Sequence, residues 1–353
     1  MEYRRLGRTG IKVSAISFGG LPTTFMPKEE VIPLIHTAID MGINYFDLDE
    51  GPAQFNDKNA YIDSASKMGE VLKERRDEVY VGVKTMKKKK SEVLEDIDKA
   101  LNLIFKGSSR EVIDIFHLAF VDYEESLNEI MDSNGGIAAL EEAKKQGLID
   151  YTLVAGHNYP ILIDAIKTGA FDVVEFPFNI IEYEVEEKLL PIAQKYDIGT
   201  VVMKPFGGGQ FGEVAEAQMK WLYSKPVSCI IPGTKTIEEL KKNIAVAESN
   251  IPLSDEENNK LLEFRERMGN RYCHRCGYCL PCPQGLRIFG LLDILNAGVL
   301  SYEKKKIAYL QAIEKGTLKP ASECVACREC ESRCPYDLPI ADMMKEMVDK
   351  FGI

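Results

Sequence analysis

Eight of the nine cysteines lie in the last quarter of the chain, in two groups of four. In each group two residues separate the first three cysteines from one another, and proline follows the fourth. Three cysteines at this spacing can wrap one face of an iron–sulfur cubane, and a fourth that precedes proline usually reaches a second cubane. The pattern predicts two [4Fe–4S] clusters, with the ligands Cys273, Cys276, Cys279, Cys282, Cys324, Cys327, Cys330 and Cys334.

The two groups are expected to exchange their fourth ligands. Crossed ligation assigns one cluster to Cys273, Cys276, Cys279 and Cys334, and the other to Cys324, Cys327, Cys330 and Cys282. The last gap of the first group is two residues, where the bacterial iron–sulfur pattern has three, so the crossing is less strictly specified there. The alternative is a pair of structural zinc sites, but zinc normally takes two Cys-x2-Cys pairs separated by a longer loop. Two clusters in one small domain indicate one-electron transfer.

The overall charge and the start of the chain limit the partners and the location. The 353 residues carry a net charge of −11, and an acidic surface repels nucleic acid and anionic membranes. The first residues are polar and charged, unlike a secretory signal, and no apolar run reaches the ~20 residues that a membrane helix needs. We therefore expect a cytoplasmic protein that binds neither nucleic acid nor membrane.

The elements that must position this chemistry alternate up to about Arg267 between strand-length apolar runs and amphipathic helical stretches. The expected strands are Ala15–Phe18, Tyr45–Leu48, Val79–Lys84, Val112–Ala119, Tyr151–Ala155, Val173–Phe176, Thr200–Lys204 and Cys229–Ile231. Eight such alternations in about 250 residues predict an α/β fold, a (β/α)₈ TIM barrel, over residues 1–268. A small, mainly helical iron–sulfur domain is expected over residues 269–353. An open doubly wound sheet is the alternative, but no GxGxxG follows the first strand.

Glycines mark a candidate phosphate site at two places along this barrel. Gly207, Gly208 and Gly209 follow the seventh expected strand and allow the backbone to approach a ligand closely. Gly233 and Thr234 begin a helix after the eighth strand, where free N–H groups attract phosphate. Phosphate binds after strands seven and eight in many TIM barrels, and plain turn glycines are the alternative of equal weight for the glycine run alone.

Several segments resemble the aldo-keto reductase family, in the branch with a C-terminal ferredoxin-like domain. They are YRRLGRTGIKVSAISFGG, GINYFDLDE, VYVGVKT, VVMKPFGGG, IIPGTKTIEELKKNI, CHRCGYCLPCPQGL and ECVACRECESRCP, which together span nearly the whole chain. The resemblance implies that Asp47 and Lys84 are catalytic, with the lysine held by the aspartate and lowering the pKa of a proton-donating tyrosine.

The resemblance also implies a nicotinamide cofactor. The residues expected to bind it are Asn179, Met203, Pro205, Gly207, Gly208, Gly233, Thr234, Lys235, Glu239 and Asn243. Members that use NADPH grip its 2′-phosphate with an arginine at the position of Glu239. A carboxylate repels that phosphate and accepts hydrogen bonds from a 2′-hydroxyl, which favours NADH, although Lys235 could still meet the phosphate.

The catalytic pattern departs from that of the family at two positions. Pro52 stands where the family tyrosine is expected, and Ala119 stands where the histidine is expected. His117 lies two residues before Ala119 and shares its face of the strand, so it is expected to point into the barrel at a deeper level. Tyr61 follows in the same long loop as Pro52 and is the candidate replacement acid. We take Asp47, Lys84, His117 and Tyr61 as the catalytic candidates.

These expectations lead to an iron–sulfur oxidoreductase that acts on a small carbonyl or alcohol. Nicotinamide carries two electrons as hydride whereas each cluster accepts one, which leaves three routes open: a flavoprotein or ferredoxin partner, a flavin in the barrel, or direct transfer from the clusters to the substrate. The alternative function is an electron-transfer subunit or redox sensor whose barrel has lost catalysis, with Asp47 and Lys84 kept as a structural ion pair.

Overall fold

The computed structural model describes residues 1–48, 60–249, 251–274, 277–296, 301–334 and 336–352. The chain forms two compact units. The first comprises Met1–Phe178, Tyr183–Pro205 and Met219–Pro252, and the second comprises Asn179–Glu182, Phe206–Gln218 and Leu253–Ile353. Two short segments from the first part of the chain therefore belong to the unit that carries the clustered cysteines.

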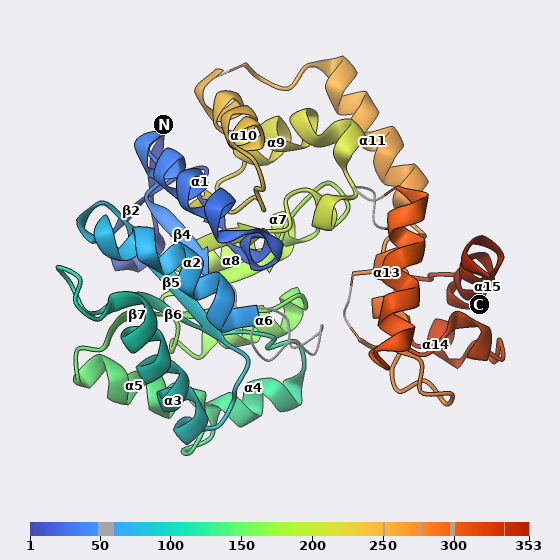
Figure 1. The fold of residues 1–353 in the computed structure, drawn as a ribbon, viewed down its shortest axis with the longest axis horizontal. Coiled ribbons are helices and arrows are strands. Elements are labelled where there is room, and N and C mark those ends of the chain that lie inside the picture. Colours follow the sequence, from blue (N-terminus) through green and yellow to red (C-terminus); the bar gives the residue numbers. More distant parts are fainter. Residues whose placement is uncertain (49–59, 250, 275–276, 297–300, 335, 353) are drawn as a thin grey trace. The chain divides into compact units, whose positions relative to one another are not determined.

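The first unit is built around a parallel barrel (Figure 1). Among the described residues, eight strands pair in chain order, each parallel to the next: β3 (Phe18–Gly19), β4 (Tyr45–Leu48), β5 (Tyr80–Thr85), β6 (Ile113–Leu118), β7 (Ile149–Ala155), β8 (Val173–Pro177), β9 (Gly199–Met203) and β10 (Cys229–Ile230). Parallel bridges from Ile16 to Ile230 and from Gly19 to Gly233 join the two ends of this sheet. The predicted (β/α)₈ barrel is confirmed, and the open doubly wound sheet is excluded. An antiparallel hairpin of β1 (Tyr3–Arg5) and β2 (Lys12–Ser14) precedes it.

Helices follow the strands and cover the barrel (Figure 1). They are α1 (Lys28–Asp40), α2 (Ala60–Glu74), α3 (Lys90–Ala100), α4 (Glu124–Met131), α5 (Gly136–Lys145), α6 (Tyr159–Lys167), α7 (Val185–Lys188), α8 (Leu190–Lys195), α9 (Ala215–Tyr223) and α10 (Ile237–Ser249). Helix α1 shows why these segments are helical. Its buried residues recur at the spacing of one helix face, Val31, Leu34, Ile35, Ala38 and Ile39, and the first turn carries two glutamates that favour the helix N-terminus.

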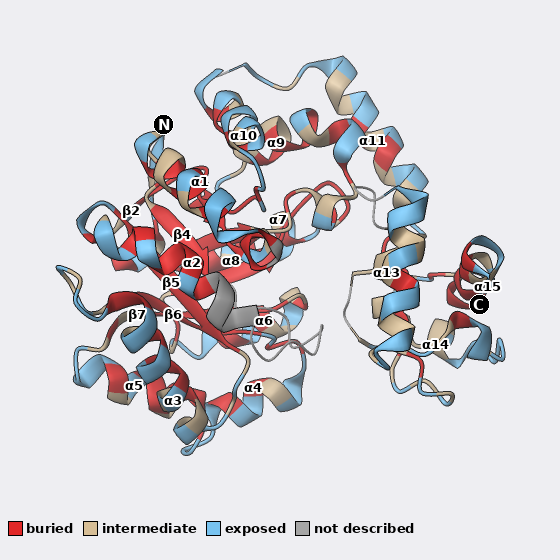
Figure 2. Cartoon of the chain, viewed as in Figure 1, coloured by how far each residue is buried: buried red, intermediate tan, exposed pale blue. Residues whose placement is uncertain are grey.

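The barrel strands are buried along most of their length (Figure 2). All residues of β4, β6 and β8 are buried. Strands covered on both faces read as continuous apolar runs, which is how the sequence shows them. Four polar residues interrupt these runs, Asp47, Asp114, His117 and Glu175. Each must find a partner, because an unpaired buried charge is costly, and Asp114 pairs with Arg76.

Element boundaries differ from expectation at three places. The first barrel strand is Phe18–Gly19 and not Ala15–Phe18, because the chain turns out of the hairpin before it enters the barrel. The amphipathic stretch Glu186–Tyr196, whose sequence pattern predicts one helix, forms two short helices, α7 and α8, which meet ahead of Pro191, a residue that cannot donate a backbone hydrogen bond. Tyr61 lies in the first turn of α2 and not in a loop.

The second unit is mainly helical. Its helices are α11 (Asp255–Met268), α12 (Ile288–Asn296), α13 (Tyr302–Glu314), α14 (Glu329–Ser332) and α15 (Ile340–Phe351). A capping box begins α11, with Ser254 and Glu257 each accepting the other's backbone N–H. Helix α15 buries Ile340, Met343, Met344, Met347 and Phe351 on one face, and these residues form the core of this unit together with Leu291 and Tyr309 of α12 and α13. Across both units, none of the described helices combines the length and apolar character that crossing a bilayer would take.

Candidate active site and metal centre

Lys84 lies between two carboxylates inside the barrel. Its Nζ is 2.8 Å from Asp47 Oδ1 and 3.2 Å from Glu175 Oε1. The three side chains come from β5, β4 and β8, and no more than 10% of any of them is exposed. The structure therefore brings the two predicted residues, Asp47 and Lys84, into direct contact and adds Glu175, which the sequence analysis did not single out.

His117 completes this buried cluster from β6. The register of β5 and β6 pairs Lys84 with His117, so both side chains enter the barrel at the same level. His117 Nδ1 is 3.4 Å from Glu175 Oε2 and 3.9 Å from Asp47 Oδ2, and its Nε2 is 3.5 Å from the Tyr45 hydroxyl. Gly82 leaves room for the imidazole, because a Cβ at this position would lie 2.6 Å from His117 Nε2 and from the Tyr45 hydroxyl. The inward orientation predicted for His117 is present.

The pKa values of His117 and Glu175 in this cluster are both shifted below their usual range. Burial lowers the pKa of His117 to about 4, so the imidazole is neutral near pH 7. Burial opposes ionisation of Glu175, but the Lys84 ammonium and His117 outweigh it and keep the pKa of Glu175 well below its usual range. Glu175 is thus an ionised carboxylate that lies against the ammonium of Lys84.

Three residues of this cluster are of types that can also bind a metal ion. Ligand atoms of Asp47, His117 and Glu175 lie within 4.8 Å of one another. The Lys84 ammonium already contacts both carboxylates, however, and a cation in the same place would have to displace it. We therefore read this cluster as an ion-pair network and not as a metal centre.

A second polar group lies at the carboxyl ends of β6, β7 and β9. Lys204, which follows β9, places its Nζ 2.5 Å from His157 Nε2, and His157 Nδ1 is 3.5 Å from Asp122 Oδ2. The backbone N–H groups of His157 and Asn158 also donate to Asp122. Although burial opposes it, these contacts lower the pKa of Asp122, so the carboxylate stays ionised and orients the imidazole. Lys204 has a φ of 51°, a left-handed conformation that side chains other than glycine seldom adopt.

The residues predicted to follow β10 lie just before α10 and in its first two turns. Gly233 joins the barrel through its bridge to Gly19, and Thr234 is buried with its hydroxyl 3.5 Å from Asn243 Nδ2. The Glu239 carboxylate accepts the backbone N–H of Lys235 at 2.8 Å. The segment is thus a helix N-terminus with an exposed lysine and an exposed glutamate beside it, which agrees with the geometry that a nucleotide phosphate needs.

The remaining predicted cofactor residues follow β8 and β9. Met203 ends β9 and is partly exposed, and Pro205 is buried two residues later. Gly207 and Gly208 have φ values of 56° and 68°, and a Cβ on Gly207 would lie 2.5 Å from the ring of Phe211. Asn179 is fully buried and its amide oxygen accepts the N–H groups of the two residues 181 and 182, as in an Asx turn.

Two of the sequence predictions concern positions that the structure describes only in part. Pro52, the residue at the family tyrosine position, lies outside the described residues, and so does the side chain of Tyr61. Ala119, at the family histidine position, is buried directly after β6. The role of Tyr61 as a proton donor stays a prediction.

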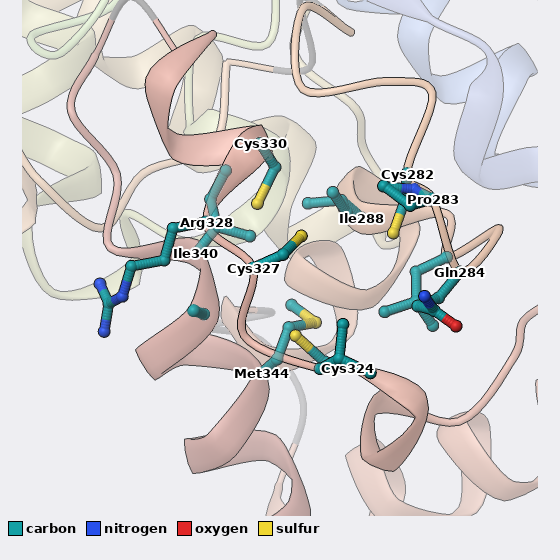
Figure 3. Close-up of a pocket in the computed structure, with 13 residues that line it drawn as sticks. Cys282, Pro283, Gln284, Ile288, Cys324, Cys327, Arg328, Cys330, Ile340 and Met344 are labelled. Carbon is teal, nitrogen blue, oxygen red and sulfur yellow. The ribbon is translucent and has the colours of Figure 1, made fainter.

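Four of the predicted cluster ligands line one pocket in the second unit. Figure 3 shows that the sulfur atoms of Cys282, Cys324, Cys327 and Cys330 point into the same space. Ile288, Ile340 and Met344 make up part of its apolar wall. This is the set that crossed ligation assigns to one cluster, and four convergent sulfurs in an apolar pocket fit the donor set of a [4Fe–4S] cluster. Ala326 and Arg328 have φ values of 53° and 60° and bend the backbone around it.

The other four predicted ligands include Cys276, which lies outside the described residues. Cys279 is buried, and Cys273 and Cys334 are partly buried against the same helical core. The imidazole of His274 stacks on the ring of Tyr336, with the centroids 3.6 Å apart and the planes at 9°. This stack holds the segment that follows Cys273 beside the segment that follows Cys334.

Sequence reasoning missed Glu175 and Tyr45, and it did not connect His157 with Asp122 and Lys204. One signal for Glu175 was available, since a single glutamate interrupts the apolar run VVEFPF of an expected barrel strand. A charge inside such a strand requires a partner of opposite charge. The partners of His157 could not be read in the same way, because they follow strands that are distant in sequence.

Comparison with known proteins gives two family matches within this chain. Residues 15–218 match the aldo/keto reductase family, and residues 272–339 match the 4Fe-4S dicluster domain. Among curated proteins, L-galactose dehydrogenase of Arabidopsis thaliana is 22% identical, covering 69% of this chain and 88% of the relative. Pyridoxal 4-dehydrogenase of Microbacterium luteolum is 21% identical, covering 74% of this chain and 88% of the relative.

Solved structures share the barrel. An aldo-keto reductase of Bacillus halodurans in its holo form superposes with a TM-score of 0.61 at 19% identity, covering 74% of this chain and 96% of that one. The thermostable aldo-keto reductase Tm1743, in complex with the inhibitor epalrestat, gives a TM-score of 0.59 at 23% identity, covering 74% of this chain and 98% of that one. At these identities the likeness establishes the fold.

Proposed function

This chain belongs to the aldo/keto reductase family and carries a 4Fe-4S dicluster domain, and on that premise we propose that it is a nicotinamide-linked, iron–sulfur oxidoreductase. Its proposed substrate is a small polar molecule with a carbonyl or a hydroxyl group. Two relatives are named as dehydrogenases, of L-galactose and of pyridoxal, which are molecules of this class. The proposal places the enzyme in the reducing cytoplasm, where cysteine thiolates remain available to iron.

The observation that carries the proposal is the contact of Lys84 with both Asp47 and Glu175 in the barrel. A bound nicotinamide would exchange hydride with the substrate carbon, and two [4Fe–4S] clusters would each take or give one electron. The ionised carboxylate of Glu175 favours a positively charged group nearby, as opposite charges attract. Oxidised nicotinamide carries a positive charge and the reduced form does not. The site therefore favours the oxidised cofactor, and with it oxidation of an alcohol over reduction of a carbonyl.

The proposed cofactor is NADH/NAD⁺ in preference to the phosphorylated form. Glu239 is the observation that supports this choice, because its carboxylate stands beside the backbone of Lys235 at the start of α10. A 2′-phosphate there would meet a like charge, whereas a 2′-hydroxyl could donate to it. The two-electron and one-electron carriers would be connected through a flavin in the barrel or through a ferredoxin or flavoprotein partner.

We propose residues 269–353 as the iron–sulfur domain and residues 1–268 as the catalytic domain. The cluster ligands are the eight cysteines, with Cys282, Cys324, Cys327 and Cys330 holding one cluster in the pocket that they line together. The other cluster would be held by Cys273, Cys276, Cys279 and Cys334.

The test is an anaerobic titration of the purified protein with NADH, or with NAD⁺ and a panel of alcohols, followed at the cluster absorption near ~400 nm. Nucleotide-dependent bleaching in the wild-type protein, lost in Lys84→Met, supports the proposal. The matched control is Lys225→Met, since Lys225 pairs with Glu186 away from the site. Clusters that neither NADH nor any alcohol with NAD⁺ can reduce would contradict it.

The alternative function is an electron-transfer subunit or redox sensor with an inactive barrel. Pro52 and Ala119 favour it, because they replace two residues of the family's catalytic set. The Lys84→Met variant distinguishes the two functions. If the protein is a sensor, a ferredoxin should reduce the clusters of the variant, without nucleotide, at an unchanged rate. If the protein is the proposed enzyme, the variant should lose the nucleotide-dependent reduction of its clusters.

A further inference from the structure

Glu182 is a buried carboxylate in the loop that follows β8, and it contacts the first cysteine motif. Its Oε2 accepts the hydroxyl of Tyr272 at 3.2 Å, and its Oε1 lies 3.6 Å from His274 Nδ1. These residues stand on either side of Cys273. Only 8% of the Glu182 side chain and 9% of the His274 side chain are exposed. A segment that precedes the cysteine motifs by about 90 residues is thus packed against one of them.

Asn179, in the same loop, holds the Glu182 carboxylate in place through hydrogen bonds. Asn179 donates from Nδ2 to Glu182 Oε2 at 2.6 Å, and its Oδ1 accepts the backbone N–H groups of Ile181 and Glu182, both at 2.9 Å. Asn179 is fully buried. Each of these bonds restrains the loop, and two donors, an amide and a phenol, converge on one oxygen of Glu182. The ionised form of a carboxylate is the one that accepts in this way without donating.

His274 carries the contact on to the second cysteine motif. Its ring stacks on Tyr336, which lies two residues beyond Cys334, and stands edge-on to the ring of Tyr272 at 5.2 Å. Phe211 lies in the Phe206–Gln218 segment of the same unit. Its ring packs against that of Tyr272, with the ring centroids 6.0 Å apart. Glu182, Tyr272, His274 and Tyr336 therefore lie around the two segments that hold Cys273 and Cys334, the pair that crossed ligation places on one cluster.

From this arrangement we propose that Glu182 is a positioning residue for the cluster of Cys273, Cys276, Cys279 and Cys334, and that its charge sets the reduction potential of that cluster and not of the other. The inference rests on the proposed cluster assignment. Groups beyond the ligands orient iron–sulfur sites, and nearby charge and hydrogen bonds shift their potentials. A fixed negative charge disfavours the added electron, so Glu182 lowers the potential of the cluster beside it. The loop after β8, the strand that carries Glu175, thereby controls one of the two electron carriers.

The test is an anaerobic redox titration of the full-length protein with mediators, without nucleotide or substrate, followed by visible absorption and electron paramagnetic resonance. The wild-type protein is expected to show two one-electron steps. Glu182→Gln removes the charge and keeps the shape, so it should raise the potential of one step and leave the other in place. Tyr272→Phe keeps the charge and removes a hydrogen bond to it, so it should shift the same step in the opposite direction.

The matched control is Glu331→Gln. Glu331 follows Cys330, accepts the backbone N–H of Ala341 and pairs with Arg328, so it lies beside the other cluster's ligands. It should move the step that Glu182→Gln leaves unchanged. Glu182→Gln overturns the inference if it shifts neither step or both equally, or if it shifts the step that Glu331→Gln shifts. If the Glu182→Gln variant loses its iron, the Tyr272→Phe variant decides. Reduction steps that stay unchanged in Tyr272→Phe would then overturn the inference. Because no nucleotide is present, these results are independent of the proposed hydride chemistry.

Discussion

Glu175 Oε1 lies 3.2 Å from Lys84 Nζ, the same ammonium that Asp47 Oδ1 contacts at 2.8 Å. One cation is therefore shared by two buried carboxylates, with a neutral His117 against both of them. Contact with the ammonium helps to keep Glu175 ionised, and the following predictions test that arrangement and its consequences.

Removing the shared charge should change the preference between the two cofactor forms. Glu175→Gln keeps the size of the side chain, removes its negative charge and leaves the contact of Lys84 with Asp47 in place. We expect the ratio of NAD⁺ affinity to NADH affinity to fall by about tenfold, which is about 1.4 kcal/mol. Fluorescence titration with both nucleotides measures it. Glu186→Gln, at a partly buried pair with Lys225, is the control and should keep the wild-type ratio. An unchanged ratio in Glu175→Gln would refute the electrostatic argument.

Removing the cation should destabilise the fold more than removing one carboxylate. Lys84→Met leaves two like charges buried without their counterion, and breaking such a pair typically costs about 3–5 kcal/mol of unfolding free energy. The double variant Lys84→Met/Glu175→Gln should recover part of this loss, because one of the stranded charges is gone. Urea unfolding of the two single variants and the double variant gives the coupling energy. Additive effects would mean that Lys84 and Glu175 do not interact.

His117 should make the stability depend on pH between about 6.5 and 4. Its pKa is near 6.5 in the unfolded chain and about 4 in the buried site, so only the unfolded state takes up a proton in this window. Stability is therefore lost as the pH falls, by up to about 3 kcal/mol from this residue. Unfolding free energies at pH 7 and pH 5 should differ less in His117→Gln than in the wild-type protein. Equal differences in both proteins would show that His117 does not titrate as described.

The space beside the imidazole should be specific to glycine. In Gly82→Ala the added Cβ would meet His117 Nε2 and the Tyr45 hydroxyl at 2.6 Å, which forces the ring out of place. We expect a loss of about 1–3 kcal/mol in unfolding free energy, as for other overpacked cores. Gly212→Ala is the control, because nothing lies within 4 Å of a Cβ at that position. Equal stability of Gly82→Ala and Gly212→Ala would contradict this packing.

The sequence predicted the barrel and the inward-facing residues well where a periodic pattern carries the information. Alternating strands and helices gave the (β/α)₈ fold, and the two-residue period of a strand placed His117 inside. Glu175 escaped because a strand sequence alone does not say which side chains from other strands share its level in the barrel. The register that pairs Lys84 with His117 is set by the closed sheet and leaves no mark in the sequence.

The contacts that the cysteine segments make could not be predicted from the sequence, for a different reason. The spacing of the cysteines predicted which residues could hold metal, because ligand geometry limits that spacing. The stack of His274 on Tyr336 and the bond from Tyr272 to Glu182 join segments that are about 60 and 90 residues apart. Packing of this kind follows from the folded unit and cannot be read from short motifs.

The metal content of the freshly isolated, anaerobically prepared protein, measured together with its absorption spectrum, tests the proposed redox function most directly. We expect about eight iron and eight sulfide per chain with a broad band near ~400 nm, as two [4Fe–4S] clusters require. Cys327→Ala, which alters one pocket ligand, should reduce the iron content to about half. A colourless protein that holds zinc on the same cysteines, or no metal, would contradict the redox function proposed for this chain.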